Sequence, residues 1–220
     1  MSTFIDDWGE LLWKGIIETF QMTSISLIIA ILIGVPLGIA VVLTRPGQLL
    51  ANRVVYQILN IMINIVRSIP FIILLFFIIP FTKYIVGTTI GVQGIIVPLV
   101  LYTAPYIARL MESAFLEVDQ GVIEAYKAMG MKKRQIIWHV LLREARPSMI
   151  LGLTLAVISL IGATAMAGLV GGGGLGDIAY RYGFQQYKTE LMYVVVAMLI
   201  ILVQIIQTIG NRWAARLKRN

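Results

Sequence analysis

Cysteine and charge are both scarce in this chain. The 220 residues include no cysteine, which excludes disulfides and thiolate metal sites within the chain. Only 13% of the residues are charged, whereas a soluble domain usually carries about 25%. Hydrophobic residues make up 59% of the chain, and the mean hydropathy is +0.87. This composition predicts an integral membrane protein with several spans.

Recognisable catalytic and metal-binding motifs are also missing from the sequence. The one histidine, His139, has no partner at metal-ligand spacing, and we expect it at the surface beside Trp138. No GxxxxGKS or GxxxxGKT phosphate loop occurs, so ATP binding by that route is not expected. The run Gly171–Gly176 formally matches GxGxxG, but an apolar span precedes it instead of a β-strand, which argues against a dinucleotide site. We therefore expect no catalytic residues, no metal and no cofactor bound by this chain.

Long uncharged runs predict five transmembrane helices in one membrane domain over residues 1–220. The clearest run is the 26 residues between Glu18 and Arg45, and a bilayer requires about 20. The third span is the least regular because it carries Pro98 and Pro105. The predicted spans are 19–44, 58–80, 92–110, 148–168 and 191–209, with a polar loop over 120–147.

The distribution of Lys and Arg predicts the orientation of these spans. Five spans divide the loops into two groups, and 13 of the 18 Lys and Arg residues fall in one group. The positive-inside rule places that group in the cytoplasm, so the N-terminus is expected outside and the C-terminus inside. Membrane topology thereby explains the net charge of +7, and no nucleic-acid partner is expected.

Arg67 is unusual because it lies within the second predicted span. It follows Ile58 by nine residues, which places it about 14 Å into the span at 1.5 Å per residue. A charge at that depth costs about 2.5 kcal/mol or more unless it faces a cavity or a partner. One hypothesis places Arg67, Ser68 and Pro70 at the translocation pathway or a gate. The other is that the helix begins later and Arg67 snorkels to the cytoplasmic interface.

Glycine is dense after the fourth predicted span, in the stretch GLVGGGGLG at 168–176. Such a stretch permits unusual backbone torsions and close helix approach. It predicts a gate hinge or a re-entrant turn at the external end, and an ordinary flexible loop is the alternative. Met166, Gly172 and Gly173 are therefore further candidates for the pathway or gate.

A second glycine pattern lies in the first span. Gly34 and Gly38 form a GxxxG pair, which predicts close packing of two helices. The alternative is that these glycines only accommodate Pro36 and local bending.

The loop 120–147 is both basic and amphipathic. It contains six of the 18 Lys and Arg residues. Val122, Ile123 and Tyr126 supply an apolar face with near-helical spacing, and Gly130 allows the chain to turn between two short helices. A helix–glycine–helix unit suits a groove on a soluble partner. An interfacial helix lying on anionic lipid is the alternative.

The same loop resembles the EAA loop of ABC importer permeases. Glu124-Ala125-Tyr126 is followed by Gly130 and then by Val140-Leu141-Leu142. The chain departs from that motif where Tyr126 replaces the second alanine, Val140 replaces isoleucine and Arg143 replaces proline. Further stretches resemble the permease subunit of the methionine ABC importer family: LTRPGQ at 43–48, NIVRSIPFIILL at 64–75, PFTKYIVGT at 80–88, APYIARLMESA at 104–114 and GGGLG at 172–176.

This resemblance implies an all-α type I ABC importer permease fold, with five transmembrane helices per subunit and two copies forming the pathway. It implies two separate cytoplasmic ATPase subunits that bind ATP and Mg, and an extracytoplasmic methionine-binding protein or lipoprotein. The implied function is import of methionine and close analogues across the cytoplasmic membrane. The implied residues of the cytoplasmic coupling helix, which docks on the ATPase, are Glu124, Ala125, Tyr126, Lys127, Ala128, Met129 and Gly130.

Two alternatives stay open at this point. The same architecture could import another small amino acid or a peptide, because no residue indicates a methionine pocket. From another class, the chain could be an ion channel or a proton-coupled carrier. All eleven Asp and Glu residues lie near span ends or in loops, which argues against proton coupling.

Overall fold

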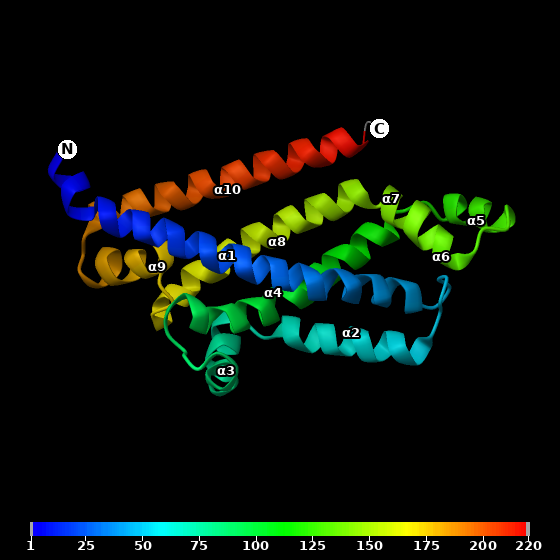
Figure 1. Ribbon diagram of the computed structural model, residues 1–220, viewed down its shortest axis with the longest axis horizontal. Coiled ribbons are helices and arrows are strands. Elements are labelled where there is room, and N and C mark those ends of the chain that lie inside the picture. Colours follow the sequence, from blue (N-terminus) through cyan, green and yellow to red (C-terminus); the bar gives the residue numbers. More distant parts are fainter. Residues whose placement is uncertain (1, 219–220) are drawn as a thin grey trace. The chain divides into compact units, whose positions relative to one another are not determined.

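The protein is helical almost throughout the part that the computed structural model describes, which is residues 2–218 with the side chains from Asp7 onward (Figure 1). No β-strand occurs within that part. Four helices are long and apolar enough to cross a membrane. They are α1 (Ser2–Thr44), α4 (Gly91–Leu116), α8 (Arg146–Ala167) and α10 (Thr189–Lys218).

The second predicted span, 58–80, is interrupted. It consists of α2 (Arg53–Ser68) and α3 (Phe71–Val86), with a sharp bend between them at Ile69 and Pro70. Proline lacks a backbone N–H and disfavours the helical conformation of the residue before it, so α2 ends there and α3 starts afresh. If the bent pair is counted as one broken span, the described residues contain five candidate crossings.

The chain divides into two compact units that share the long helices. Unit 1 comprises residues 1–30, 69–103 and 157–206, and unit 2 comprises residues 31–68, 104–156 and 207–220. Each of α1, α4, α8 and α10 therefore contributes one part to each unit.

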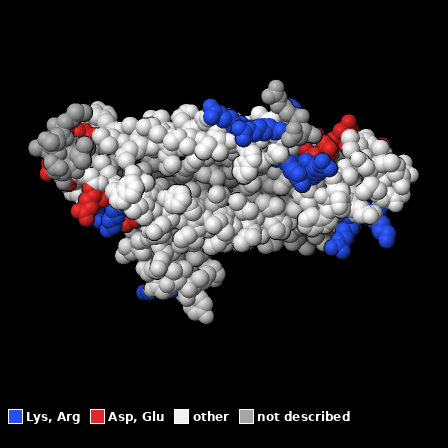
Figure 2. All heavy atoms as spheres, turned by 45° about the horizontal axis from the view of Figure 1, so that its top comes forward, with Lys and Arg blue, Asp and Glu red and all other residues white. Residues whose placement is uncertain are grey.

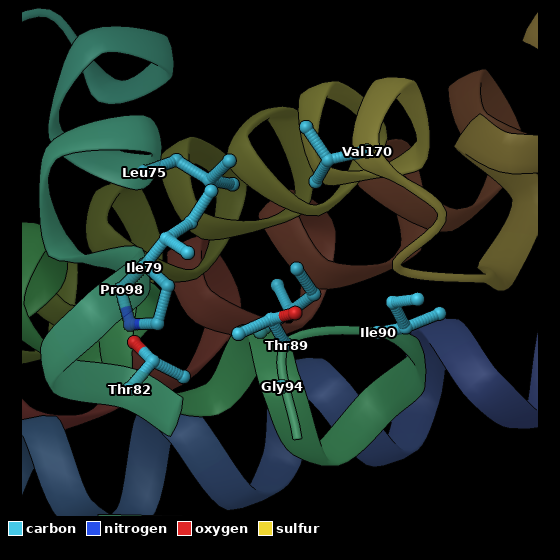
Figure 3. Close-up of a pocket in the computed structure, with 9 residues that line it drawn as sticks. Leu75, Ile79, Thr82, Thr89, Ile90, Gly94, Pro98 and Val170 are labelled. Atoms are coloured by element: carbon cyan, nitrogen blue, oxygen red, sulfur yellow. The ribbon is translucent and has the colours of Figure 1, made fainter. Parts of the chain in front are cut away.

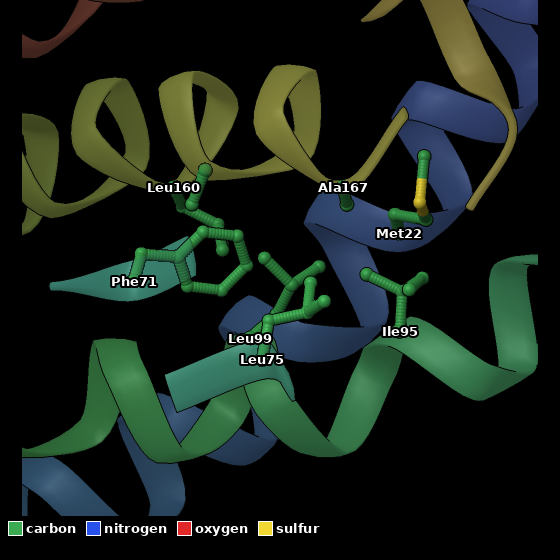
Figure 4. Packing of buried hydrophobic residues seen from close by; sticks show 8 residues of the cluster. Met22, Phe71, Leu75, Ile95, Leu99, Leu160 and Ala167 are labelled. Carbon is green, nitrogen blue, oxygen red and sulfur yellow. The ribbon is translucent and has the colours of Figure 1, made fainter. Parts of the chain in front are cut away.

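Unit 1 has a core of aliphatic and aromatic side chains from α1, α3, α4 and α8 (Figure 4). Phe71 in this core meets Tyr102 edge to face, with ring centroids 5.2 Å apart. A second cluster joins α1, α10 and the segment after α8, around Leu175 and Leu191. The first cluster consists of Met22, Phe71, Leu75, Ile95, Leu99, Leu160, Ala163 and Ala167.

Unit 2 is organised by the close approach of α1 and α4. A Cβ atom added at Gly34 would lie 2.5 Å from the carbonyl oxygen of Ala104, and one at Gly38 would lie 2.6 Å from that of Ala108. Only glycine therefore allows this packing, and the predicted role of the GxxxG pair in helix packing is confirmed. Val41 and Ile63 pack beside Ala108 in the adjoining core.

Large apolar side chains cover much of the outer surface. On α10, for example, Ile200, Ile205 and Ile209 are each more than half exposed. Figure 2 shows that Lys, Arg, Asp and Glu gather in separate groups, with broad uncharged areas between them. A soluble monomer rarely exposes so much contiguous apolar surface, whereas a lipid-facing surface requires it.

Candidate functional site

The polar segment after α4 begins with a capped helix in unit 2. α5 (Gln120–Ala128) is preceded by Asp119, whose side chain accepts a hydrogen bond from the backbone N–H of Gly121 at 2.8 Å. This bond satisfies one of the amides that have no acceptor within the helix. Asp119 is not among the residues predicted from the sequence, although an aspartate immediately before a helical pattern is a recognisable N-cap signal.

Gly130 turns the chain between α5 and the helices that follow. Its φ angle is +79°, a left-handed conformation that favours glycine, and its N–H donates to the carbonyl of Lys127 at 3.0 Å. The chain then resumes as α6 (Lys133–Gln135), the π-helical η1 (Ile136–Leu141) and α7 (Leu142–Glu144). The predicted arrangement of two short helical stretches separated by glycine is confirmed.

The segment buries one face and exposes the other. Ile123, Ile136 and Val140 are buried, with 0 to 4% of their surface exposed. Met129 is 66% exposed and Trp138 is 61% exposed, so two large apolar side chains stand on an otherwise polar surface. Such side chains are typical of a contact surface. Of the predicted coupling residues, Tyr126 is half-buried, and those that are exposed are Glu124, Ala125, Lys127, Ala128, Met129 and Gly130.

Arg143 occupies the position at which the EAA motif has proline. In the absence of proline the chain continues in helical form from Ile136 through Glu144. Arg143 lines a polar groove of about 700 Å³ in unit 2, beside α5. The other charged residues of the groove are Glu117, Asp119, Glu144, Arg146 and Lys218.

A buried charge cluster joins α2 to α4 within unit 2. Glu112 on α4 has only 4% of its side chain exposed, and it pairs with Arg109 one turn earlier and with Arg45, at 3.8 Å. The Arg109 guanidinium also donates to the side-chain oxygens of Asn60 and Asn64 on α2. The carboxylate is thus compensated by two bases, as a buried charge requires. This cluster was not predicted from the sequence.

Arg67 lies in the last turn of α2 and is exposed. Its guanidinium carbon lies 5.9 Å from the centre of the Tyr106 ring, at the distance of a cation–π contact. Ser68 donates its hydroxyl to the carbonyl of Asn64 at 2.7 Å, and Pro70 caps the start of α3. A pathway role and a snorkelling role for Arg67 both stay predictions.

The glycine-rich stretch is a packed turn in unit 1. α8 is extended by η2 (Gly168–Val170), and the chain then reverses into α9 (Gly174–Ile178) and the π-helical η3 (Ala179–Gln185). Gly172 is buried, Gly173 is half-buried, and Met166 in the last turns of α8 is 50% exposed. The backbone of the turn is hydrogen-bonded to α8, since the Gly172 N–H donates to the Ala167 carbonyl at 3.0 Å.

A small cavity of about 90 Å³ lies among α3, α4 and Val170 in unit 1 (Figure 3). Its lining is apolar apart from two threonines, Thr82 and Thr89. The Thr82 hydroxyl is buried and has no hydrogen-bond partner among the described residues. The volume is well below the 300 to 1,000 Å³, roughly, of ligand pockets, so this cavity is not a site for a whole substrate.

Comparison with known proteins assigns the family. A family model described as the binding-protein-dependent transport system inner membrane component matches residues 34–220. The chain belongs to this family. It is therefore a multi-pass membrane permease and a transport component, and the predicted all-α importer-permease fold is confirmed.

Several relatives cover most of the chain. The probable D-methionine transport system permease protein MetI of Vibrio cholerae is 46% identical over 208 residues, covering 94% of this chain and 92% of that protein. The methionine import system permease protein MetP of Bacillus subtilis is 46% identical over 169 residues, covering 77% and 76%. A chain in the inward-facing structure of the MetNI methionine ABC transporter has a TM-score of 0.93 and 46% identity, covering 96% of this permease and 98% of that chain.

Proposed function

We propose that this permease is the membrane subunit of an ATP-driven importer whose energy comes from a separate ATPase. The observation that carries the proposal is the exposed surface formed by α5 and Gly130. The chain has no phosphate loop of its own, so active transport requires a partner that hydrolyses ATP. A glycine-broken helical segment with exposed Met129 is suited to a groove on such a partner.

Methionine is the proposed substrate, together with close analogues. The support is the names of the two permease relatives, one for D-methionine transport and the other for methionine import, at 46% identity to this chain. Among the residues that the structure describes, none identifies a methionine pocket. In this proposal an extracytoplasmic binding protein or lipoprotein selects the ligand and delivers it.

The proposed assembly contains two copies of this permease and two ATPase subunits, in the cytoplasmic membrane. The excess of Lys and Arg in one group of loops supports an external N-terminus and a cytoplasmic C-terminus. ATP and Mg bind to the ATPase subunits. Closure of the ATPase pair on ATP moves the two coupling helices together and turns the pathway outward, and hydrolysis reverses this movement.

The decisive experiment reconstitutes the permease with its ATPase and binding protein in liposomes. We expect uptake of labelled methionine that requires ATP, and co-purification of the permease with the ATPase. Glu124→Lys reverses one charge on the exposed face of α5, and we expect it to lower uptake at least tenfold. Glu10→Lys is the matched control, because Glu10 is an exposed acid on α1 and the charge change is the same.

Two results would refute the proposal. One is a permease that does not retain the ATPase and whose uptake is the same after Glu124→Lys. The other is uptake that follows a proton or ion gradient without ATP, which would indicate a carrier or a channel. Competition by other amino acids and short peptides against labelled methionine tests the substrate separately from the ATPase coupling.

A further inference from the structure

Two side chains of α1 hold the turn between α8 and α9. The Glu18 carboxylate accepts a hydrogen bond from the backbone N–H of Gly174 at 2.7 Å, and the Thr19 hydroxyl accepts one from the N–H of Leu175 at 2.9 Å. These are the first amides of α9, which have no acceptor within their own helix. Each bond joins residues 156 positions apart, and both lie within unit 1.

The clamp formed by Glu18 and Thr19 requires glycine opposite it. A Cβ atom at Gly173 would lie 2.6 Å from the Glu18 carboxylate oxygen, and one at Gly174 would lie 2.7 Å from the Thr19 hydroxyl. The φ angles of the two glycines are +83° and +79°, in the left-handed region. Glycine is therefore needed here both for space and for backbone conformation.

The rest of the turn is equally confined. A Cβ at Gly168 would lie 2.8 Å from the Asp177 Cα, and one at Gly176 would lie 2.5 Å from the Ala165 Cα, so α8 and α9 pack backbone against backbone. The Gly91 N–H of α4 donates to the Gly171 carbonyl at 3.0 Å. A hinge needs free torsions and free space, and a close-packed contact of this kind offers neither.

The Glu18 contact depends on the carboxylate as an acceptor more than on its pairing with a base. Lys14 lies 3.9 Å from Glu18, but 72% of the Lys14 side chain is exposed. An exposed ion pair contributes little because water and salt screen it. A hydrogen bond from a backbone amide to a carboxylate is charge-assisted and stronger than a neutral one.

We propose that Glu18 and Thr19 are positioning residues that make the glycine turn a rigid joint between α1, α8 and α9. These three helical segments then move together during transport, and the conformational change takes place elsewhere in the chain. The inference rests on the proposed function only in that it concerns a transport cycle. The dense glycines serve close packing, and the turn is not a gate hinge.

Thiol labelling tests this directly, because the natural chain contains no cysteine. Leu175→Cys places a reporter at a position that is 2% exposed and keeps the backbone N–H that donates to Thr19, and Met22→Cys provides a second reporter at a position that is 0% exposed, beside Gly174. Glu10→Cys is the exposed control on α1. The assembled transporter in nanodiscs is treated with a water-soluble maleimide at rest and during ATP turnover.

A rigid joint keeps both buried reporters at least tenfold less labelled than the Glu10→Cys control, at rest and during turnover. Adding Glu18→Ala to either reporter should raise its labelling at least threefold. Labelling of a buried reporter that increases during turnover would show a hinge and overturn the inference, as would no effect of Glu18→Ala. The effect of Glu18→Ala on labelling at rest tests the rigid joint even if the wild-type assembly shows no ATP-dependent uptake. That absence of uptake would count against the proposed function alone.

Uptake per ATP hydrolysed gives a readout that a loss of folding would not mimic. We expect Glu18→Ala to lower this ratio about tenfold, the effect of losing roughly one charge-assisted hydrogen bond. Glu18→Gln keeps an acceptor oxygen at the same reach and should restore most of the ratio. Equal ratios for Glu18→Ala and wild type would contradict the inference, and so would a Gln variant as impaired as the Ala variant.

Discussion

Removal of Arg109 should leave a buried carboxylate without its main partner. Glu112 has 4% of its side chain exposed, and Arg109 is the nearer of its two bases, since Arg45 lies at 3.8 Å and is 42% exposed. Loss of one partner of a buried pair costs about 3 to 5 kcal/mol. Because 24% of the Arg109 side chain is exposed, the lower end applies, about 3 kcal/mol.

The perturbation is Arg109→Met, which keeps much of the side-chain length and removes the charge. For a chain of this size a loss of about 3 kcal/mol lowers Tm by about 6 to 12 °C. The measurement is thermal unfolding of the purified permease in detergent, followed by tryptophan fluorescence. Arg53→Met is the matched control, because Arg53 is an exposed arginine at the start of α2 and should change Tm little.

A double variant distinguishes ion pairing from packing. Arg109→Met combined with Glu112→Met removes both charges, so most of the lost stability should return. The reasoning is refuted if the Tm of Arg109→Met stays within roughly 2 °C of the wild-type Tm. It is also refuted if the double variant loses more stability than the two single variants lose together.

Three further outcomes are expected. Gly38→Ala should destabilise the permease by about 1 to 3 kcal/mol, because its Cβ would lie 2.6 Å from the Ala108 carbonyl, whereas Gly162→Ala, with no atom within 4 Å, should be tolerated; equal Tm values would contradict this. Asp119→Ala should cost about 1 kcal/mol and speed amide hydrogen exchange in α5, and unchanged exchange would rule out the cap. Burial raises the pKa of the Asp177 carboxyl, although the neighbouring Arg181 guanidinium acts to lower it. Part of the wild-type stability is therefore present at low pH and is lost as the pH rises from about 3.9 through the raised pKa. The Tm of Asp177→Asn relative to wild type should therefore increase with pH over that range, and a constant difference would refute it.

Local features of the fold could be predicted from the sequence because each depends on neighbouring residues. Uncharged runs of sufficient length indicate the long helices, and Gly130 between two amphipathic stretches indicates the turn that follows α5. Apart from the GxxxG pair of α1, contacts between distant segments left no comparable pattern. No periodicity could show that Glu18 and Thr19 cap a helix 156 residues away. The glycine stretch suggested a hinge or a re-entrant turn, and its close packing against α1 and α8 is visible only in the structure.

The position of Arg67 can be understood from the two faces of α2, one polar and packed against α4, the other apolar and exposed. Asn60, Asn64 and Arg67 are spaced by four and three residues, so they share one face of the helix. That face meets α4, since both asparagines accept from Arg109 and the Arg67 guanidinium lies over Tyr106.

The other face of α2 is apolar and exposed. Ile58, Ile61 and Ile65 are 53%, 57% and 59% exposed, which is unfavourable in water and favourable in hydrocarbon. Average hydropathy joins α2 and α3 into one span, in which Arg67 is an isolated charge. Helical spacing instead identifies a polar stripe of Asn60, Asn64 and Arg67. Arg67 contacts Tyr106 on α4, which is the kind of protein partner that a charge within a span requires.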